Sequence, residues 1–406
     1  MPAAATVPSA EPAPAFRWFL LSLAAWFAAY GLQAVLFSSL VVFYLEADPA
    51  WVGVAQGCLM APSVVFLLVG GAVADRVDRR RLLISLCLGA AVLSASLLFA
   101  VATHLLSLGW LLAFALAMGT VQAFVIPARD SLLSEVVGPN LGRGIAVAML
   151  TQWGMQAVGA LLGASARFIG IEVALGLHVA LLVVGVLPLT LLPPSRRAAP
   201  APSAGGRLHE LAAGIREVIG SRVLLPPLLL VASVGLFFIG PFMVVFPVLI
   251  RSHYGGGVGE LGLVNSAFSV GTILGSFLVL GRGGLRRRGR AQILVLGVSA
   301  SCIAVVGLGV PYPVALLAVL SWGCFAAIFM NAGRGVFQEH ASPQHRGRVL
   351  AVYALGFMGS SGLVGAPLFG ALVQAVGPLH SCLLAAVGAV IAAVLTALFT
   401  DIWNND

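Results

Sequence analysis

Twelve long apolar runs constrain this chain more than any other feature of its sequence. Each run has roughly 20 or more residues with few charges, the length that an α-helix needs to cross the hydrocarbon core of a bilayer. A backbone in lipid must satisfy its hydrogen bonds internally, so the runs predict an all-α integral membrane protein with twelve transmembrane helices. The runs cover residues 17–44, 51–73, 82–103, 106–128, 143–166, 172–192, 223–250, 260–281, 291–309, 312–333, 349–373 and 379–400.

The composition supports this class and excludes others. Of the 406 residues, 60% are hydrophobic and only 9% are charged, whereas a soluble domain carries about 25% charged residues. This balance excludes a soluble enzyme, a nucleic-acid-binding module and a disordered protein. The five cysteines fall inside apolar runs without metal-ligand spacing, and we find no catalytic constellation. We therefore expect a protein that is not an enzyme and holds no metal or cofactor.

The arginine residues indicate the orientation of the helices. The net charge is +8 and all 22 basic residues are arginine, placed in short clusters between the runs. If the chain starts inside, 20 arginines fall in inner segments, and only Arg167 and Arg251 fall in outer segments. Basic residues concentrate on the cytoplasmic side of membrane proteins. We therefore expect both termini in the cytoplasm and the protein in a bacterial inner membrane.

The chain divides into two similar halves. The string PARDSLLSEVVGPNLGRGIA at 127–146 resembles AGRGVFQEHASPQHRGRVLA at 332–351, an offset of about 205 residues. Such repeats predict two pseudo-symmetric six-helix bundles around a central cavity. The predicted parts are a disordered tail at 1–16, a bundle at 17–192, a cytoplasmic linker with an amphipathic helix at 193–221, a second bundle at 222–400 and a tail at 401–406.

One loop carries a family resemblance. The segment 70–83 reads GGAVADRVDRRRLL, and it resembles the signature loop of the major facilitator superfamily. The run at 127–146 is similar to the drug- and siderophore-exporter branch of that family, which includes enterobactin-type exporters. The resemblance extends over nearly the whole chain. It implies the major facilitator fold and transport by alternating access.

The resemblance also implies a cytoplasmic gate. In the superfamily, the matching Asp and Arg latch the two bundles, so we expect Asp75, Arg79 and Asp130 to hold the outward-open state. A carboxylate at a helix end can also favour the dipole of a neighbouring helix N-terminus. The alternative is that these charges only set the topology. The predicted gate residues are Gly71, Asp75, Arg76, Arg79, Arg129, Asp130, Glu135, Arg334 and Glu339.

The loop of the second half that corresponds to 70–83 has no acidic residue, so we expect an asymmetric gate. Small residues in helices 5 and 11 predict close helix packing, and a proline there predicts a kink. These residues are Gly159, Gly163, Gly365 and Pro367. The antiporter branch has Gly-Pro where this chain has Gly159 and Ala160, a departure from its pattern.

Polar residues inside the apolar runs are the candidates for the cavity wall. Amides that faced lipid would lack hydrogen-bond partners, so we expect them to face protein or water. Each could instead bond a neighbouring helix. The candidates are Tyr30, Gln33, Gln122, Gln152, Gln156, Asn265, Trp322, Asn331 and Tyr353, and phenylalanines of helix 7 would add apolar wall at 237, 238, 242 and 246.

The acidic residues are informative by their placement. None of the 14 lies near the middle of a predicted span, which suits neutral, lipophilic or anionic cargo better than dications. Proton coupling would then use residues at the helix ends. Asp130 and Glu135 are candidates on the inner side, and Glu46 or Asp48 on the outer side.

These features predict a secondary transporter that exports a small amphiphilic compound, such as a drug-like molecule or a siderophore, in exchange for protons. Its expected partners are this small-molecule substrate and the lipid bilayer, without nucleic acid, and it is expected to be a monomer. A uniporter or a lysophospholipid flippase of the same fold is the first alternative. A membrane scaffold or sensor that does not transport is the second.

Overall fold

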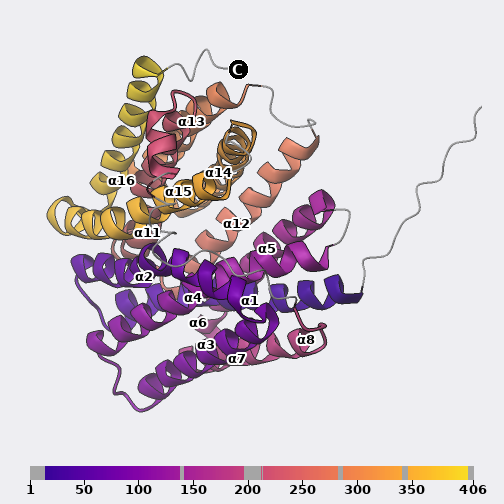
Figure 1. Cartoon of the computed structure of the whole chain (residues 1–406). Helices are drawn as coiled ribbons and strands as arrows, with labels where there is room; N and C mark the ends of the chain where they lie inside the picture. The colour runs from indigo at the N-terminus through magenta and orange to yellow at the C-terminus, as the bar shows by residue number, and fades with distance from the viewer. Residues whose placement is uncertain are drawn as a thin grey trace, which may run out of the picture.

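The computed structural model describes residues 14–137, 141–195, 212, 214–281, 287–340 and 346–400. Helices make up both halves of this part of the chain (Figure 1). The N-terminal half contains α1 (Pro14–Ser39), η1 (Leu40–Tyr44), α2 (Pro49–Arg76), α3 (Arg79–Ala102), α4 (Leu108–Val136), α5 (Leu141–Ala164), α6 (Ala166–Ile169), α7 (Ile171–Val184) and α8 (Val186–Thr190). The C-terminal half contains α10 (Leu225–Val234), η2 (Gly235–Ile239), α11 (Gly240–Ser252), α12 (Val258–Gly281), α13 (Arg288–Gly307), α14 (Tyr312–His340), α15 (Arg346–Met358), η3 (Gly359–Gly365) and α16 (Ala366–Phe399).

The number of membrane-spanning helices agrees with the sequence once one break is taken into account. Among the described residues, eleven helices are long and apolar enough to cross a membrane, and the last covers Val349–Phe399. Gly377 interrupts this last helix with a φ of 80°, a conformation that favours glycine, and Pro378 follows it. The segment therefore contains the last two predicted runs, and the all-α membrane fold is confirmed.

Several helices are longer than their apolar runs, and all at the same end of the molecule. We call the end where α8 stops and α10 begins the linker side, and the opposite end the far side. On the linker side α2 extends to Arg76, α4 to Val136 and α14 to His340. Apolarity is needed only within the hydrocarbon, so a helix can continue past it with polar residues. Rigid helix ends, rather than loops, therefore carry the charged motif residues.

Most of the predicted linker lies outside the described residues. Residues 214–220 are helical, and Val218 in this segment is fully buried against the core. Ile219 beside it is 60% exposed. This end of the predicted amphipathic helix therefore packs one apolar side chain on the protein and leaves another on the surface.

Within each half, helices cross at glycines. A Cβ atom added to Gly159 of α5 would lie 2.0 Å from the carbonyl oxygen of Ala28 in α1, and one added to Gly271 of α12 would lie 2.0 Å from that of Leu320 in α14. Such approach is possible only without a side chain, and it maximises van der Waals contact in a solvent that offers no hydrophobic driving force between helices. Glycine therefore sets which helices of a half lie against each other.

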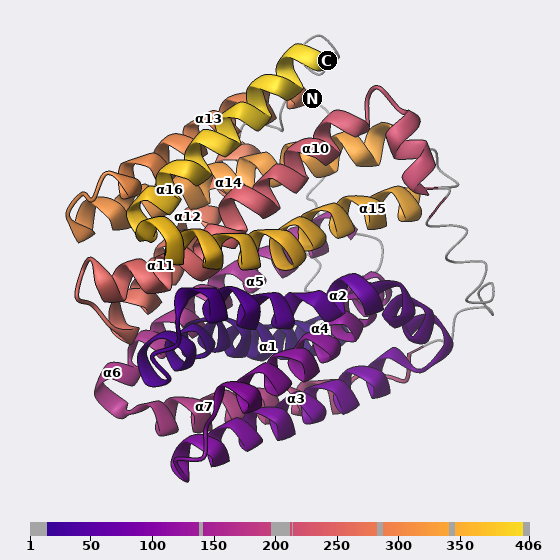
Figure 2. The same cartoon turned by 90° about the vertical axis from the view of Figure 1, so that its left-hand side faces the viewer.

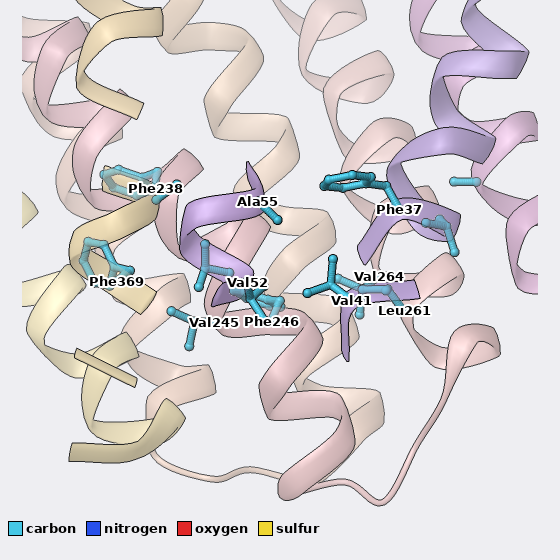
Figure 3. Close-up of a cluster of buried hydrophobic side chains, with 14 of the residues drawn as sticks. Phe37, Val41, Val52, Ala55, Phe238, Val245, Phe246, Leu261, Val264 and Phe369 are labelled. Carbon is cyan, nitrogen blue, oxygen red and sulfur yellow. The ribbon is translucent and has the colours of Figure 1, made fainter. Parts of the chain in front are cut away.

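The two halves lie side by side, with α2 and α5 of the first facing α16 and α12 of the second (Figures 1 and 2). Buried apolar side chains from both halves form one continuous core. In Figure 3, Val52 of α2 lies among Val245, Phe246 and Phe369 of the C-terminal half, and Val41 of η1 lies beside Leu261 and Val264. These residues belong to the far-side part of their helices, so the halves share their core there.

Candidate functional site

The first contact between the halves on the far side is an ion pair at the surface. Arg251, at the end of α11, places Nη2 2.9 Å from Oε2 of Glu46, which follows η1. The same guanidinium donates from Nη1 to the carbonyl oxygen of Val42 at 2.7 Å. Both side chains are well exposed, at 38% and 69%. Arg251 thus connects the far-side ends of the first helices of the two halves.

A second ion pair connects the halves between α6 and α12. Nη1 of Arg167 lies 3.6 Å from Oε1 of Glu260. Glu260 is held in place because its Oε2 accepts a hydrogen bond from the backbone N–H of Gly257 at 2.8 Å. The sequence analysis did not predict these two pairs. One feature of the sequence could have predicted these pairs: Arg167 and Arg251 are the two arginines that the predicted topology places on the outer side.

Small residues allow the halves to approach closely between these ion pairs and the centre. A Cβ added to Gly262 of α12 would lie 2.5 Å from Cβ of Ala164 in α5. One added to Gly53 of α2 would lie 2.4 Å from the carbonyl oxygen of Ala366 in α16. The halves are therefore in direct backbone contact on the far side, along α5–α12 and along α2–α16.

An aromatic cluster lies further along the same interface. We define the aromatic cluster as Phe238, Phe242, Phe246, Phe268 and Trp322 of the C-terminal half. The Trp322 ring centroid lies between 5.1 and 6.0 Å from those of the four phenylalanines. Trp153 of α5 contacts the cluster from the other half, with 6.5 Å between its ring and that of Phe268.

The predicted cavity residues divide into two groups. Trp322 is in the aromatic cluster, and Gln152 and Gln156 are partly exposed on α5 next to Trp153. Tyr30 packs edge-on against Phe27 of its own helix, and Gln33 is buried. Trp322, Gln152 and Gln156 thus lie in or beside the aromatic cluster, and their role in a cavity wall stays a prediction.

The remaining candidates have local partners. The amides of Asn265 and Asn331 donate to the carbonyl oxygens of residues 261 and 327, one turn earlier in their own helices. Tyr353 is buried against Phe337 within the C-terminal half. The amide nitrogen of Gln122 is buried without a hydrogen-bond partner. None of these contacts crosses between the halves.

Two buried amides were missed by the sequence analysis. Gln56 of α2 donates to the hydroxyl of Ser38 in α1 at 3.0 Å. Gln292 of α13 is fully buried, and neither its amide nitrogen nor its amide oxygen has a hydrogen-bond partner among the described residues. Both lie inside predicted membrane spans. The criterion that selected the other amides, a polar residue within an apolar run, therefore covers them as well.

On the linker side, each ion pair that the structure describes lies within one half. Arg79 at the start of α3 contacts Glu135 at the end of α4, and its Nε donates to the carbonyl oxygen of Ala74. Asp130, its predicted partner, is instead bonded by Arg129, at 2.9 Å. The side chain of Asp75 lies outside the described residues. The pairing of Arg79 with Asp130 therefore stays a prediction for a different conformation.

The C-terminal half has an equivalent ion pair. Arg288 at the start of α13 contacts Glu339 at the end of α14, with 2.6 Å between Nη1 and Oε2. The elements match those of Arg79 and Glu135 in the first half. Glu339 is thus the counterpart of Glu135, and the loop acids of the first half, Asp75 and Asp78, have no counterpart in the second. Arg334, a predicted gate residue, is exposed, as is Arg76.

Two further linker-side residues have structural roles that the sequence analysis did not assign. Asp78 caps α3, because its carboxylate accepts hydrogen bonds from the backbone N–H groups of Arg80 and Arg81. Glu135 also accepts a hydrogen bond of 2.8 Å from the hydroxyl of Ser195, where the chain leaves α8. Gly71 lies on α2 between the membrane span and this charged end.

The predicted packing residues all lie at helix crossings. Gly159 and Gly163 face α1, and an added Cβ at Gly163 would lie 2.7 Å from Val35. Gly365 lies next to Gly240 of α11. Pro367 lies beside Gly57 of α2, across the interface between the halves. Within the described ranges, no group of three or more His, Cys, Asp or Glu side chains could hold a metal ion.

Comparisons with known proteins agree with this architecture. The sequence matches the Major Facilitator Superfamily over residues 18–354 and 237–403. No protein with a curated description matches it. A variant of the nucleoside transporter NupG has a similar structure, with a TM-score of 0.75 and 16% identity over 95% of this chain and 99% of that one.

Two other solved structures are similar. A bacterial homologue of the human lysosomal transporter Spinster, in an inward-facing and occupied conformation, has a TM-score of 0.69 and 16% identity over 96% of this chain and 97% of that one. The human organic anion transporter MFSD10 has a TM-score of 0.66 and 16% identity over 94% of this chain and 99% of that one. At these identities the likeness concerns the fold.

Proposed function

The chain belongs to the Major Facilitator Superfamily, whose members are transporters and not enzymes, and from that premise we propose that it exports small amphiphilic organic compounds by alternating access, in exchange for protons. One observation carries the proposal. The ion pairs between the halves are on the far side, whereas the described linker-side ion pairs stay within one half. Within the described residues, ion pairs thus join the halves at one end only, which supports one of the two end states of alternating access.

The direction of transport follows from the orientation that we propose. The arginine distribution favours a cytoplasmic linker side in a bacterial inner membrane. The described conformation is then closed to the outside, ready to accept cargo from the cytoplasm. Export of a drug-like molecule or a siderophore is consistent with this state.

The class of cargo is supported by the chemistry of the interface. Aromatic rings and amides line it, and the acidic residues of the described helices lie at helix ends. A cation would find no carboxylate partner near the centre. The proteins of similar structure include a nucleoside transporter and an organic anion transporter, which supports a small organic cargo here.

The linker-side latch belongs to the opposite end state. We propose that Asp75, Arg79 and Asp130 join the halves there when the far side opens. In the described conformation Arg79 contacts Glu135 and Asp130 is bonded by Arg129. Exchange of these partners stays within the N-terminal half, because both acids are on α4. The contact that joins the halves would then come from Asp75, whose carboxylate could accept hydrogen bonds at a helix N-terminus of the C-terminal half.

A uniporter or lipid flippase is the second candidate, and the placement of the acids favours it. Many proton-driven pumps have a carboxylate near the middle of the membrane, and this chain has none there. Proton coupling must then depend on helix-end groups such as Asp130, Glu135 or Glu46.

Transport by purified protein in proteoliposomes tests the proposal. Proteoliposomes with the protein inserted inside-out and an inside-acid pH gradient should accumulate an uncharged lipophilic dye such as N-phenyl-1-naphthylamine faster than protein-free liposomes, and faster than proteoliposomes in which nigericin has collapsed the gradient. Dye movement that is protein-dependent and insensitive to the gradient would favour the uniporter. No protein-dependent movement of the dye or of a fluorescent lysophospholipid would contradict both candidates.

A further inference from the structure

We infer that the aromatic cluster, together with Trp153, binds a planar, uncharged aromatic group of the cargo. This inference rests on the proposed function and adds a substrate class to it. The ion pairs and glycine crossings described above do not involve the rings of this cluster. Its rings come from η2, α11, α12 and α14, with Trp153 added from α5 of the other half.

The position of the cluster is the first support. The contacts of α5 and α6 with α12 follow one another from the far side towards the centre: Arg167 with Glu260, Ala164 with Gly262, Ala157 with Ser266, and then Trp153 with Phe268. Of these four contacts, the aromatic one is nearest to the linker side. Cargo that enters from the linker side would meet these rings first at the closed end.

The exposure of the rings is the second support. Trp322, Phe246 and Phe238 are buried and form the base of the cluster. Phe242, Phe268 and Trp153 are only partly buried. Ring surface of Phe242, Phe268 and Trp153 is therefore left over after the packing of the rings against one another.

The free surface of Phe268 does not face lipid. The exposed apolar side chains of α12 include Val270, Leu274 and Phe277. At 3.6 residues per turn these positions lie about 120–180° around the helix from Phe268. Phe268 thus points away from the lipid-facing side of its helix, towards α5 and α11, as its contacts with Trp153 and Phe242 require.

The geometry of the rings favours an aromatic guest. Trp322 meets Phe242 at 79° and Phe268 at 69°, and Trp153 meets Phe268 at 64°. These edge-to-face arrangements leave ring faces and edges that a further planar ring can contact, which gains about 0.5–1.5 kcal/mol per pair beyond area burial in proteins.

The electrostatics favour an uncharged guest over a cation. Aromatic faces attract cations, but a cation taken out of water also needs a counter-charge. The acid of α12, Glu260, is eight residues from Phe268, about 12 Å along the helix, and it is already engaged by Arg167 and the N–H of Gly257. The neighbouring polar groups, such as Gln156 of α5, are neutral amides.

Equilibrium binding to detergent-purified protein tests the inference. The probes are 1-naphthol and coumarin as planar neutral compounds, cyclohexanol as a non-planar neutral compound and tetraethylammonium as a cation. We expect the planar neutral probes to bind, and Phe268→Leu to weaken their binding about tenfold, since the ring contacts are lost but apolar volume is kept. Phe277→Leu on the lipid face of the same helix is the matched control and should leave binding unchanged.

A second pair of variants separates ring contact from folding. Trp153→Phe keeps a ring and should bind nearly as well as the natural protein, whereas Trp153→Leu should lose affinity like Phe268→Leu, with the thermal unfolding of both unchanged. Equal binding by Phe268→Leu and Phe277→Leu would overturn the inference, as would tighter binding of tetraethylammonium or no binding of either planar probe. Binding needs no gradient, so intact binding without vesicle transport would contradict the proposed function and leave this inference standing.

Discussion

At the scale of single residues, Arg251 makes the most informative contact between the halves. It bonds both the carboxylate of Glu46 and the backbone carbonyl of Val42. Exposed ion pairs contribute only about 0.2–1 kcal/mol. A contact of this strength biases the far side towards closure and still allows it to open in every transport cycle. A buried charge pair would be far more costly to separate.

Neutralising Glu46 should therefore have a small effect and removing Arg251 a larger one. We expect Glu46→Gln to lower the population closed on the far side by less than about fivefold, because Arg251 keeps its bond to Val42. Arg251→Ala should lower this population more than Glu46→Gln does, because it removes both bonds. The measurement is the maleimide labelling rate of Ala160→Cys, a buried interface position, in protein without its own cysteines. High salt screens the ion pair and should change the labelling rate of the natural protein only as much as Glu46→Gln does. Equal labelling rates in Glu46→Gln and Arg251→Ala would contradict a role for the bond to Val42.

We expect Asp75 to stabilise the opposite end state, the one that is closed on the linker side. Asp75→Asn should weaken the state closed on the linker side, because the amide cannot pair with an arginine. The Ala160→Cys labelling rate should then fall, since less protein is open on the far side. Asp78→Asn is a suitable control, because an asparagine can still cap α3. A fall of the same size in both variants would argue against the latch.

At the scale of helices, the same kind of residue serves two purposes. Gly159 lets α5 approach α1 inside one half, and Gly262 lets α12 approach α5 across the interface. The first contact should persist through the transport cycle, while the second must break when the far side opens. A side chain added at each position should therefore act on different equilibria.

Gly262→Leu should open the far side, and Gly159→Leu should destabilise the fold. At Gly262 the added side chain conflicts with Ala164, and separation of the halves relieves this conflict. At Gly159 it meets the backbone of Ala28, and no movement between halves relieves it. Overpacking of this kind costs about 1–3 kcal/mol or more. We expect Gly262→Leu to speed up Ala160→Cys labelling with little change in unfolding temperature. We expect Gly159→Leu to lower the unfolding temperature.

At the scale of the whole molecule, closure of the two sides should be reciprocal, because two rigid halves that separate at one end approach at the other. Spin labels at Ser134 of α4 and His340 of α14 report on the linker side, since both are exposed at helix ends there. Gly262→Leu should shift their distance distribution to shorter values. A change in far-side labelling without any change in this distance would contradict rigid-body movement.

The order of the helices, their membrane class and their division into halves could be predicted from the sequence, because apolar run length is a local property that the bilayer thickness converts directly into a helix. The placement of arginines even marked the far-side contacts, as Arg167 and Arg251 are the two exceptions to the inner clusters. The positions of Gly159 and Gly163 at a helix crossing also followed from residue size.

Which charged residues pair was decided only by the tertiary structure. Arg79 could reach Asp130 or Glu135, five positions apart on α4, and the relative position of the starts and ends of α3 and α4 selects Glu135. The aromatic cluster likewise combines rings from η2 and α11, from α12 and from α14, and Trp153 of α5 contacts it from the other half. A hydrophobic run needs only its own residues to define it, whereas a contact between helices depends on their crossing angles and on the state of the transport cycle.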